Sequence, residues 1–158
     1  FPNGIDIKID IQNIPYHLTS VQVMKEMWAK AGIRATINAM PAGQYWDVWK
    51  STPFGFTSWT HRALGVQVLA LAYRTGVPWN ESHFNNAEFD ALLTKAEGTL
   101  DIDERRKLLG RIEEIFQEEG PIVQPLWRSI TTAYDKRVQG FNLHPTLFIF
   151  GNELAISS

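Results

Sequence analysis

The chain has 158 residues, of which 44% are hydrophobic and 20% charged, and its formal net charge is −2. This length suits one compact domain, and the near-neutral charge argues against a nucleic-acid-binding protein. Cysteine is absent, which excludes disulfides, thiolate metal sites and cysteine nucleophiles. Apolar runs such as residues 68–73 are far shorter than the roughly 20 residues that a membrane-spanning helix needs.

The first fifty residues predict strand, helix, strand and helix. In 5–12 isoleucine alternates with polar residues, which is the period of a half-buried strand. A helix capped at Thr19 or Ser20 should follow, and 33–40 alternates again as a second strand. Pro41 then suits the first position of a short aromatic helix. Because a helix connects them, the two strands are expected to be parallel.

The remaining segments predict one more strand, three helices and a closing set of strands. Residues 54–59 read as the third strand, 65–73 as a short apolar helix and 74–86 as a surface loop. The two later helices are expected at 88–97 and, with Asp101 as its cap and Gly120-Pro121 at its end, 101–119. The closing strands are expected at 122–127, 130–134 and 138–143.

The residues that commonly hold metals or nucleotides form no recognisable pattern. The histidines are scattered without HxxxH or HxH spacing, so we expect no metal site. Glycine-rich phosphate-binding motifs and the GxSxG motif of α/β hydrolases are also missing from the sequence. We therefore expect no bound cofactor.

The segment 58–62 has the strongest functional character. It combines the ring of Trp59, the hydroxyl of Thr60, the imidazole of His61 and the guanidinium of Arg62. It follows a predicted strand and precedes a predicted helix, so it should lie where α/β sheets bind ligands. The alternative is an ordinary strand-end loop in which Trp59 is buried and Arg62 is solvated.

Five segments, taken together in this order, resemble one family. They are 28–33 (WAKAGI), 79–90 (WNESHFNNAEFD), 103–113 with its Arg105-Arg106 and Ile112-Glu113, 121–127 (PIVQPLW) and 138–141 (VQGF). They are similar to the segments of the extracellular solute-binding proteins of family 5, the dipeptide-, oligopeptide- and nickel-binding receptors of ABC importers. The likeness runs from about residue 5 to residue 145.

The resemblance implies a fold and a place within a larger receptor. The fold would be α/β, with a mixed, largely parallel sheet flanked by helices, like the second lobe of a type II periplasmic binding protein. Residues 1–158 would form a single lobe, the carboxy-terminal ligand-binding lobe of a two-lobe receptor. The last ~15 residues would return toward the missing amino-terminal lobe. A piece of a longer receptor would also explain why the chain opens without a signal peptide.

The resemblance also implies a function that is not enzymatic. The protein would be the substrate-binding component of an ABC importer in the periplasm and would deliver its solute to the membrane permease. That solute would be a small molecule, such as a peptide or a peptide-like or anionic compound, captured in the cleft between the lobes. The lobe face that normally meets the missing lobe could also support a homodimer.

Individual residues can be matched to the family's ligand cleft. Trp59 matches a cleft tryptophan, and Tyr45, with Trp46 one place off, matches a second cleft aromatic residue. Peptide-binding members carry an aspartate three residues after the tryptophan, where it pairs with the ligand's amine. This chain has Arg62 there, which suits a carboxylate or a phosphate instead. Thr60 and His61 would supply further polar contacts.

Two other functions are compatible with the sequence. One is a stand-alone sensory or partner-binding domain that never had an amino-terminal lobe. The other is a small hydrolase that uses His61 or His144 with a carboxylate.

Overall fold

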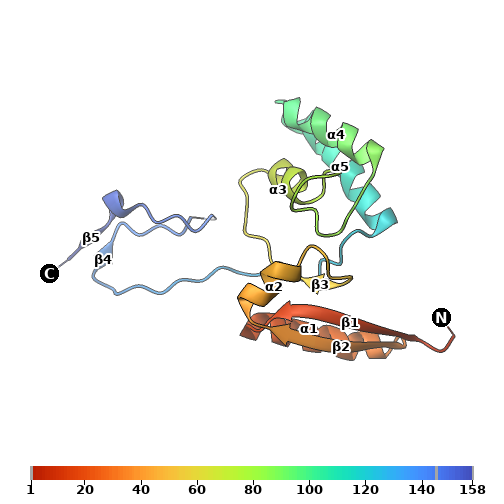
Figure 1. Ribbon diagram of the computed structural model, residues 1–158. Coiled ribbons are helices and arrows are strands. Elements are labelled where there is room, and N and C mark those ends of the chain that lie inside the picture. The colour runs from red at the N-terminus through yellow and green to blue at the C-terminus, as the bar shows by residue number, and fades with distance from the viewer. Residues whose placement is uncertain (1, 145, 158) are drawn as a thin grey trace. The chain divides into compact units, whose positions relative to one another are not determined.

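The computed structural model describes residues 2–144 and 146–157 (Figure 1). Contacts within the chain divide it into two compact units, Phe1–Trp59 and Thr60–Ser158. They are called the amino-terminal and the carboxy-terminal unit, and each is described by itself. That the whole chain forms one lobe stays a prediction.

The amino-terminal unit is built on a parallel sheet. Its described strands are β1 (Ile5–Gln12), β2 (Ile33–Met40) and β3 (Gly55–Phe56), in the spatial order β2-β1-β3. β1 and β2 pair in parallel over their whole length, as predicted, and β3 pairs in parallel with the end of β1. The helix α1 (Pro15–Ala29) connects β1 to β2 and packs against them (Figure 1).

The two faces of β1 differ because successive side chains of a strand point to opposite sides. Ile9 and Ile11 are buried in the core with Val21 of α1. Asp10 and Gln12 alternate with them and are also buried. The central strand therefore carries an apolar core on one face and buried polar groups on the other.

Two element boundaries in this unit differ from the prediction. α1 begins at Pro15 with Ile14 as its N-cap, so Thr19 and Ser20 lie inside the helix and do not cap it. A proline is favourable at the first helical position because its φ angle is already helical, and this signal determines the start. The predicted strand 54–59 forms a ladder only over its β3 residues.

The short aromatic helix is α2 (Ala42–Val48). Pro41 is the N-cap residue of this helix, whereas it was predicted to be the first helical residue. Tyr45 and Trp46 lie on this helix, and Trp49 follows it as the C-cap residue.

The carboxy-terminal unit begins with helices that follow the prediction closely. They are α3 (Gly65–Ala72), α4 (Ala87–Gly98) and α5 (Ile102–Glu119). Asp101 caps α5 by accepting a hydrogen bond from the Glu104 amide, and α5 ends at a left-handed Gly120. None of the helices in the described ranges is long and apolar enough to cross a membrane.

Aromatic rings fill the core between these helices. Phe89 of α4 and Phe116 of α5 are stacked, with ring centroids 5.3 Å apart. Phe84 and Tyr73 contact Phe116 edge-on. Such contacts stabilise a core beyond the area that they bury.

A buried asparagine organises the loop before α4. The Asn80 amide nitrogen donates to the backbone oxygens of Arg74 and Phe84, and its side-chain oxygen accepts from the Phe84 amide and the Ser82 hydroxyl. The loop is therefore held by an internal polar centre, which satisfies these buried groups.

Beyond α5, two of the predicted strands are wrong. Residues 122–127 and 130–134 have no regular structure, and Trp127 is 89% exposed. A strand needs a neighbouring strand for its backbone groups, and the described residues supply none for these segments. The predicted strand 138–143 is reduced to β4 (Val138–Gln139), which pairs antiparallel with β5 (Ala155–Ile156) after the 3-10 helix η1 (Gly151–Glu153). The predicted α/β class with a mixed, largely parallel arrangement of strands is confirmed.

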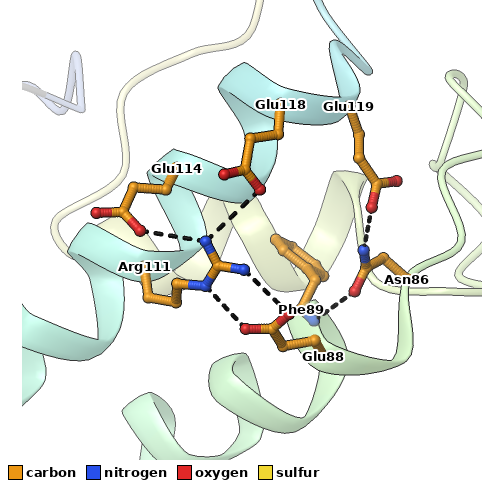
Figure 2. Close-up of polar contacts among 7 residues, drawn as sticks. All are labelled: Asn86, Glu88, Phe89, Arg111, Glu114, Glu118 and Glu119. Atoms are coloured by element: carbon orange, nitrogen blue, oxygen red, sulfur yellow. Dashed lines mark hydrogen bonds and ion pairs between the residues drawn. The ribbon is translucent and has the colours of Figure 1, made fainter.

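Arg111 of α5 fastens α4 to α5 (Figure 2). Its guanidinium donates to both carboxylate oxygens of Glu88, at 2.8 and 3.2 Å, and to Glu114 at 3.2 Å. Glu118 lies 3.6 Å from the same guanidinium. The hydrogen bonds from Arg111 lower the pKa of the Glu88 carboxyl, although desolvation opposes this effect.

This ion pair should be visible in the acid dependence of stability. Because the pKa of Glu88 is lower in the folded than in the unfolded chain, its contribution is present above the unfolded value and is lost as the pH falls through the folded pKa. Replacing Glu88→Gln should therefore reduce the loss of unfolding free energy between about pH 6 and about pH 3. Urea unfolding at a series of pH values measures this loss.

The matched control is Glu113→Gln on α5, an exposed residue that is not among the carboxylate partners of Arg111. It should keep the acid dependence of the original chain. Identical profiles for the Glu88 variant and the original chain would contradict the assignment.

Candidate functional site

The parallel strands of the amino-terminal unit all end at one edge of the sheet. β1 ends at Gln12, β2 at Met40 and β3 at Phe56, and parallel pairing brings these ends together. α1 and α2 begin beside this edge, and residues 57–59 leave β3 there. We call it the carboxyl edge. Parallel α/β sheets bind ligands outside the carboxyl ends of their strands.

Two pairs of hydroxyl groups hold the segment that leads to Trp59. The Tyr45 hydroxyl is 2.5 Å from Thr57 Oγ1, and the Tyr16 hydroxyl is 2.7 Å from Ser58 Oγ. The β3 ladder ends at Phe56. Beyond it, these side-chain hydrogen bonds attach residues 57 and 58 to the two helices. Tyrosines from α1 and α2 thus hold the two residues directly before Trp59.

The predicted aromatic residues differ in how much ring surface they offer. Trp46 is 46% exposed, Trp59 is half-buried and Tyr45 is fully buried. The Tyr45 ring contacts Trp46 edge-on, with centroids 5.5 Å apart. Trp46 and Trp59 therefore have accessible ring surface, whereas Tyr45 supports Trp46 and Thr57 from the interior. A direct contact between Tyr45 and a solute stays a prediction.

The other predicted site residues open the carboxy-terminal unit. Thr60 and His61 are exposed, and Arg62 is half-buried. The Arg62 Nη1 atom donates to the Thr60 hydroxyl at 2.6 Å and to the backbone oxygens of Thr60 and His61, both at 3.2 Å. The guanidinium thus folds back over its own turn. A role in binding stays a prediction for all three residues.

The structure adds residues that the sequence did not single out. Tyr16 and Thr57 lie at the carboxyl edge with Ser58 of the predicted segment 58–62, and Thr52 precedes β3. Tyr16 comes directly after Pro15 at the start of α1. Their proximity follows from the parallel pairing of β1 with β3, which cannot be recognised from a two-residue strand in the sequence.

A curated protein is similar in sequence to this chain. It is the probable deoxycholate-binding periplasmic protein YgiS of Escherichia coli (strain K12), which is 24% identical over 146 residues. The match covers 90% of this chain and 27% of YgiS. No family model matches the chain.

Solved structures are similar over nearly the whole chain. HbpA2 from Haemophilus parasuis is 25% identical with a TM-score of 0.74, and the match covers 100% of this chain and 33% of HbpA2. DppA from Helicobacter pylori, an ABC transporter-associated periplasmic binding protein in complex with the peptide STSA, is 21% identical with a TM-score of 0.74. That match covers 99% of this chain and 32% of DppA.

The parallel sheet and these similarities define the fold as that of a periplasmic binding protein. The resemblance to the extracellular solute-binding proteins of family 5 is confirmed. The chain spans between a quarter and a third of the length of the relatives that it matches, 27% of YgiS and 33% of HbpA2.

The hydroxyl pair inside the carboxyl edge can be tested by Tyr45→Phe. This change leaves the buried ring in place and removes its bond to Thr57, so the unfolding free energy should fall by about 1 kcal/mol. Amide hydrogen exchange of 57–59 should become faster. Urea unfolding and exchange mass spectrometry measure the two effects.

Tyr134→Phe is the control, because Tyr134 is an exposed tyrosine whose replacement should leave both measurements unchanged. Equal exchange rates at 57–59 in the Tyr45 variant and the original chain would show that the pair does not hold this segment.

Proposed function

We propose that this chain is a lobe of the substrate-binding component of an ABC importer, which captures a small solute at the carboxyl edge in the periplasm. The observation that carries the proposal is the accessible ring surface of Trp46 and Trp59 at this edge, where hydroxyl pairs hold the segment before Trp59. Rigid aromatic walls bury the apolar part of a ligand at a small entropic cost. The lobe would close on the solute together with a second lobe.

The exposed residues of the last third of the chain support its place in a larger receptor. Trp127, Phe148 and Ile149 are apolar side chains that remain largely exposed in this chain. An apolar patch larger than a few hundred Å² normally marks an interaction surface, and we propose that these side chains contribute to one. We assign this surface to the amino-terminal lobe, since the relatives are three to four times as long as this chain. The earlier expectation of a homodimer has no support from the relatives.

The chemistry of Arg62 favours a solute with a carboxylate. Within the described structure only its Nη1 atom is engaged, which leaves the Nε and Nη2 hydrogens for a bidentate contact. A carboxylate is therefore the solute group that the Arg62 guanidinium suits best.

The names of the relatives are compatible with this solute class. YgiS is named for deoxycholate, an apolar ring system that carries a carboxylate, and DppA was solved with a peptide, which ends in a carboxylate. No contact in the described structure favours the sensory-domain or hydrolase alternative.

The test is a calorimetric titration of the complete polypeptide that carries this chain, with sodium deoxycholate and with the peptide STSA as separate probes. We expect saturable binding of at least one probe. Arg62→Gln should weaken that binding about tenfold or more, because it removes a charge-assisted hydrogen bond to the carboxylate.

Arg106→Gln on α5 is the matched control, since Arg106 is an exposed arginine that pairs with Asp103, and it should bind like the original protein. Failure of both probes to bind would count against a carboxylate-bearing solute of either kind. Unchanged affinity in Arg62→Gln would show that Arg62 does not contact the solute.

A further inference from the structure

Asp10 is a buried carboxylate at the centre of the parallel sheet. It lies on the polar face of β1 and is 6% exposed. Its Oδ1 atom accepts a hydrogen bond from Asn38 at 2.7 Å and pairs with Lys8 at 3.0 Å, while Oδ2 accepts from the Thr52 hydroxyl at 2.6 Å. One carboxylate thus connects β1, β2 and the segment that enters β3.

The group is held in its charged form. Burial disfavours the charge, but the hydrogen bonds from Thr52, Asn38 and Lys8 outweigh it, so the pKa of Asp10 is lowered. Hydrogen bonds to an ionised acceptor are short and strong. The bond from Thr52 is therefore a firm attachment rather than an incidental contact.

β3 needs such an attachment because its ladder is short. Only Asp10↔Gly55 and Ile11↔Phe56 are paired, with one further backbone bond from the Asp10 amide to the Phe54 oxygen at 3.0 Å. A two-residue ladder on a sheet edge is weakly held by its backbone alone. The side-chain bond from Thr52 fixes the chain immediately before this ladder.

Thr52 and Tyr45 both lie close to Gly55, the first residue of β3. A Cβ atom placed on Gly55 would lie 3.0 Å from the Tyr45 hydroxyl and 3.1 Å from Thr52 Cγ2. The two side chains therefore flank the start of β3 where a side chain of residue 55 would project. Tyr45 in turn bonds to Thr57, two residues before Trp59.

We propose that Asp10 is a positioning residue for the carboxyl edge: through Thr52 it fixes residues 52–59 and thereby the ring of Trp59. The positioning itself stands on the contacts of the amino-terminal unit. Its consequence for solute capture rests on the proposed function. Asp10 is buried and acts on the carboxyl edge through Thr52 and the short β3 ladder.

The test compares three threonine variants of the full chain by ¹⁹F NMR with 5-fluorotryptophan. Thr52→Val removes the hydroxyl at constant shape, Thr52→Ser restores a hydroxyl, and Thr36→Val is the matched control on β2. Thr36 is exposed and lies opposite Lys8 in the register. The Trp59 resonance is assigned by its loss in Trp59→Phe.

We expect Thr52→Val to shift or broaden the Trp59 resonance, Thr52→Ser to retain it, and Thr36→Val to leave it unchanged. The resonance of exposed Trp127 should stay in place in every variant. Asp10→Asn is a second variant that should reproduce the change, and it decides the question if Thr52→Val does not fold. An unchanged Trp59 resonance in the folded variants would overturn the proposal.

Titration with sodium deoxycholate then tests the consequence in the complete polypeptide. The Thr52→Val variant should bind this probe about tenfold more weakly at a similar unfolding free energy, and Thr52→Ser should bind it normally. A shifted Trp59 resonance with unchanged affinity would overturn the link to capture. If the original protein does not bind the probe, the proposed function fails for this solute, while the Trp59 resonance still decides the positioning role.

Discussion

The carboxyl edge depends on one constraint, the placement of β1 between β2 and β3 in a parallel sheet. Its pairing with β2 extends over the whole strand, whereas its pairing with β3 is limited to two residues. Backbone pairing is therefore extensive between β1 and β2 and short between β1 and β3, the strand that leads to Trp59. Polar side chains, above all Asp10 and the two tyrosines, compensate for this short pairing.

This division matters for the proposed binding site. The proposed wall rests on a short ladder and a few hydrogen bonds, so changing single hydroxyl groups can alter it without rebuilding the core of Ile9, Ile11 and Val21. The carboxy-terminal unit is held differently, by stacked phenylalanines and by Arg111 between α4 and α5. Its last third carries exposed apolar side chains, among them Trp127, Phe148 and Ile149.

Most of the regular elements could be predicted from the sequence because their signals are local. The alternation in 5–12, the Asp101 cap and the left-handed Gly120 each act within a few residues. The start of α1 was misplaced because Pro15 outweighed the hydroxyl residues that follow it. The candidate site was anticipated only in part: Trp59 stays a predicted site residue, and the contacts of Tyr16 and Thr57 beside it were not foreseen.

The sequence by itself determined the α/β class, the parallel pairing of β1 with β2, and the likeness to family 5. Tertiary structure alone decided that Tyr45 is interior while Trp46 is exposed, and that residues 122–134 remain without strand partners. It also decided that Asp10 meets Thr52, across forty-two residues of chain. The physical reason is that periodicity and capping are local, whereas burial and strand pairing depend on groups brought together from distant parts of the chain.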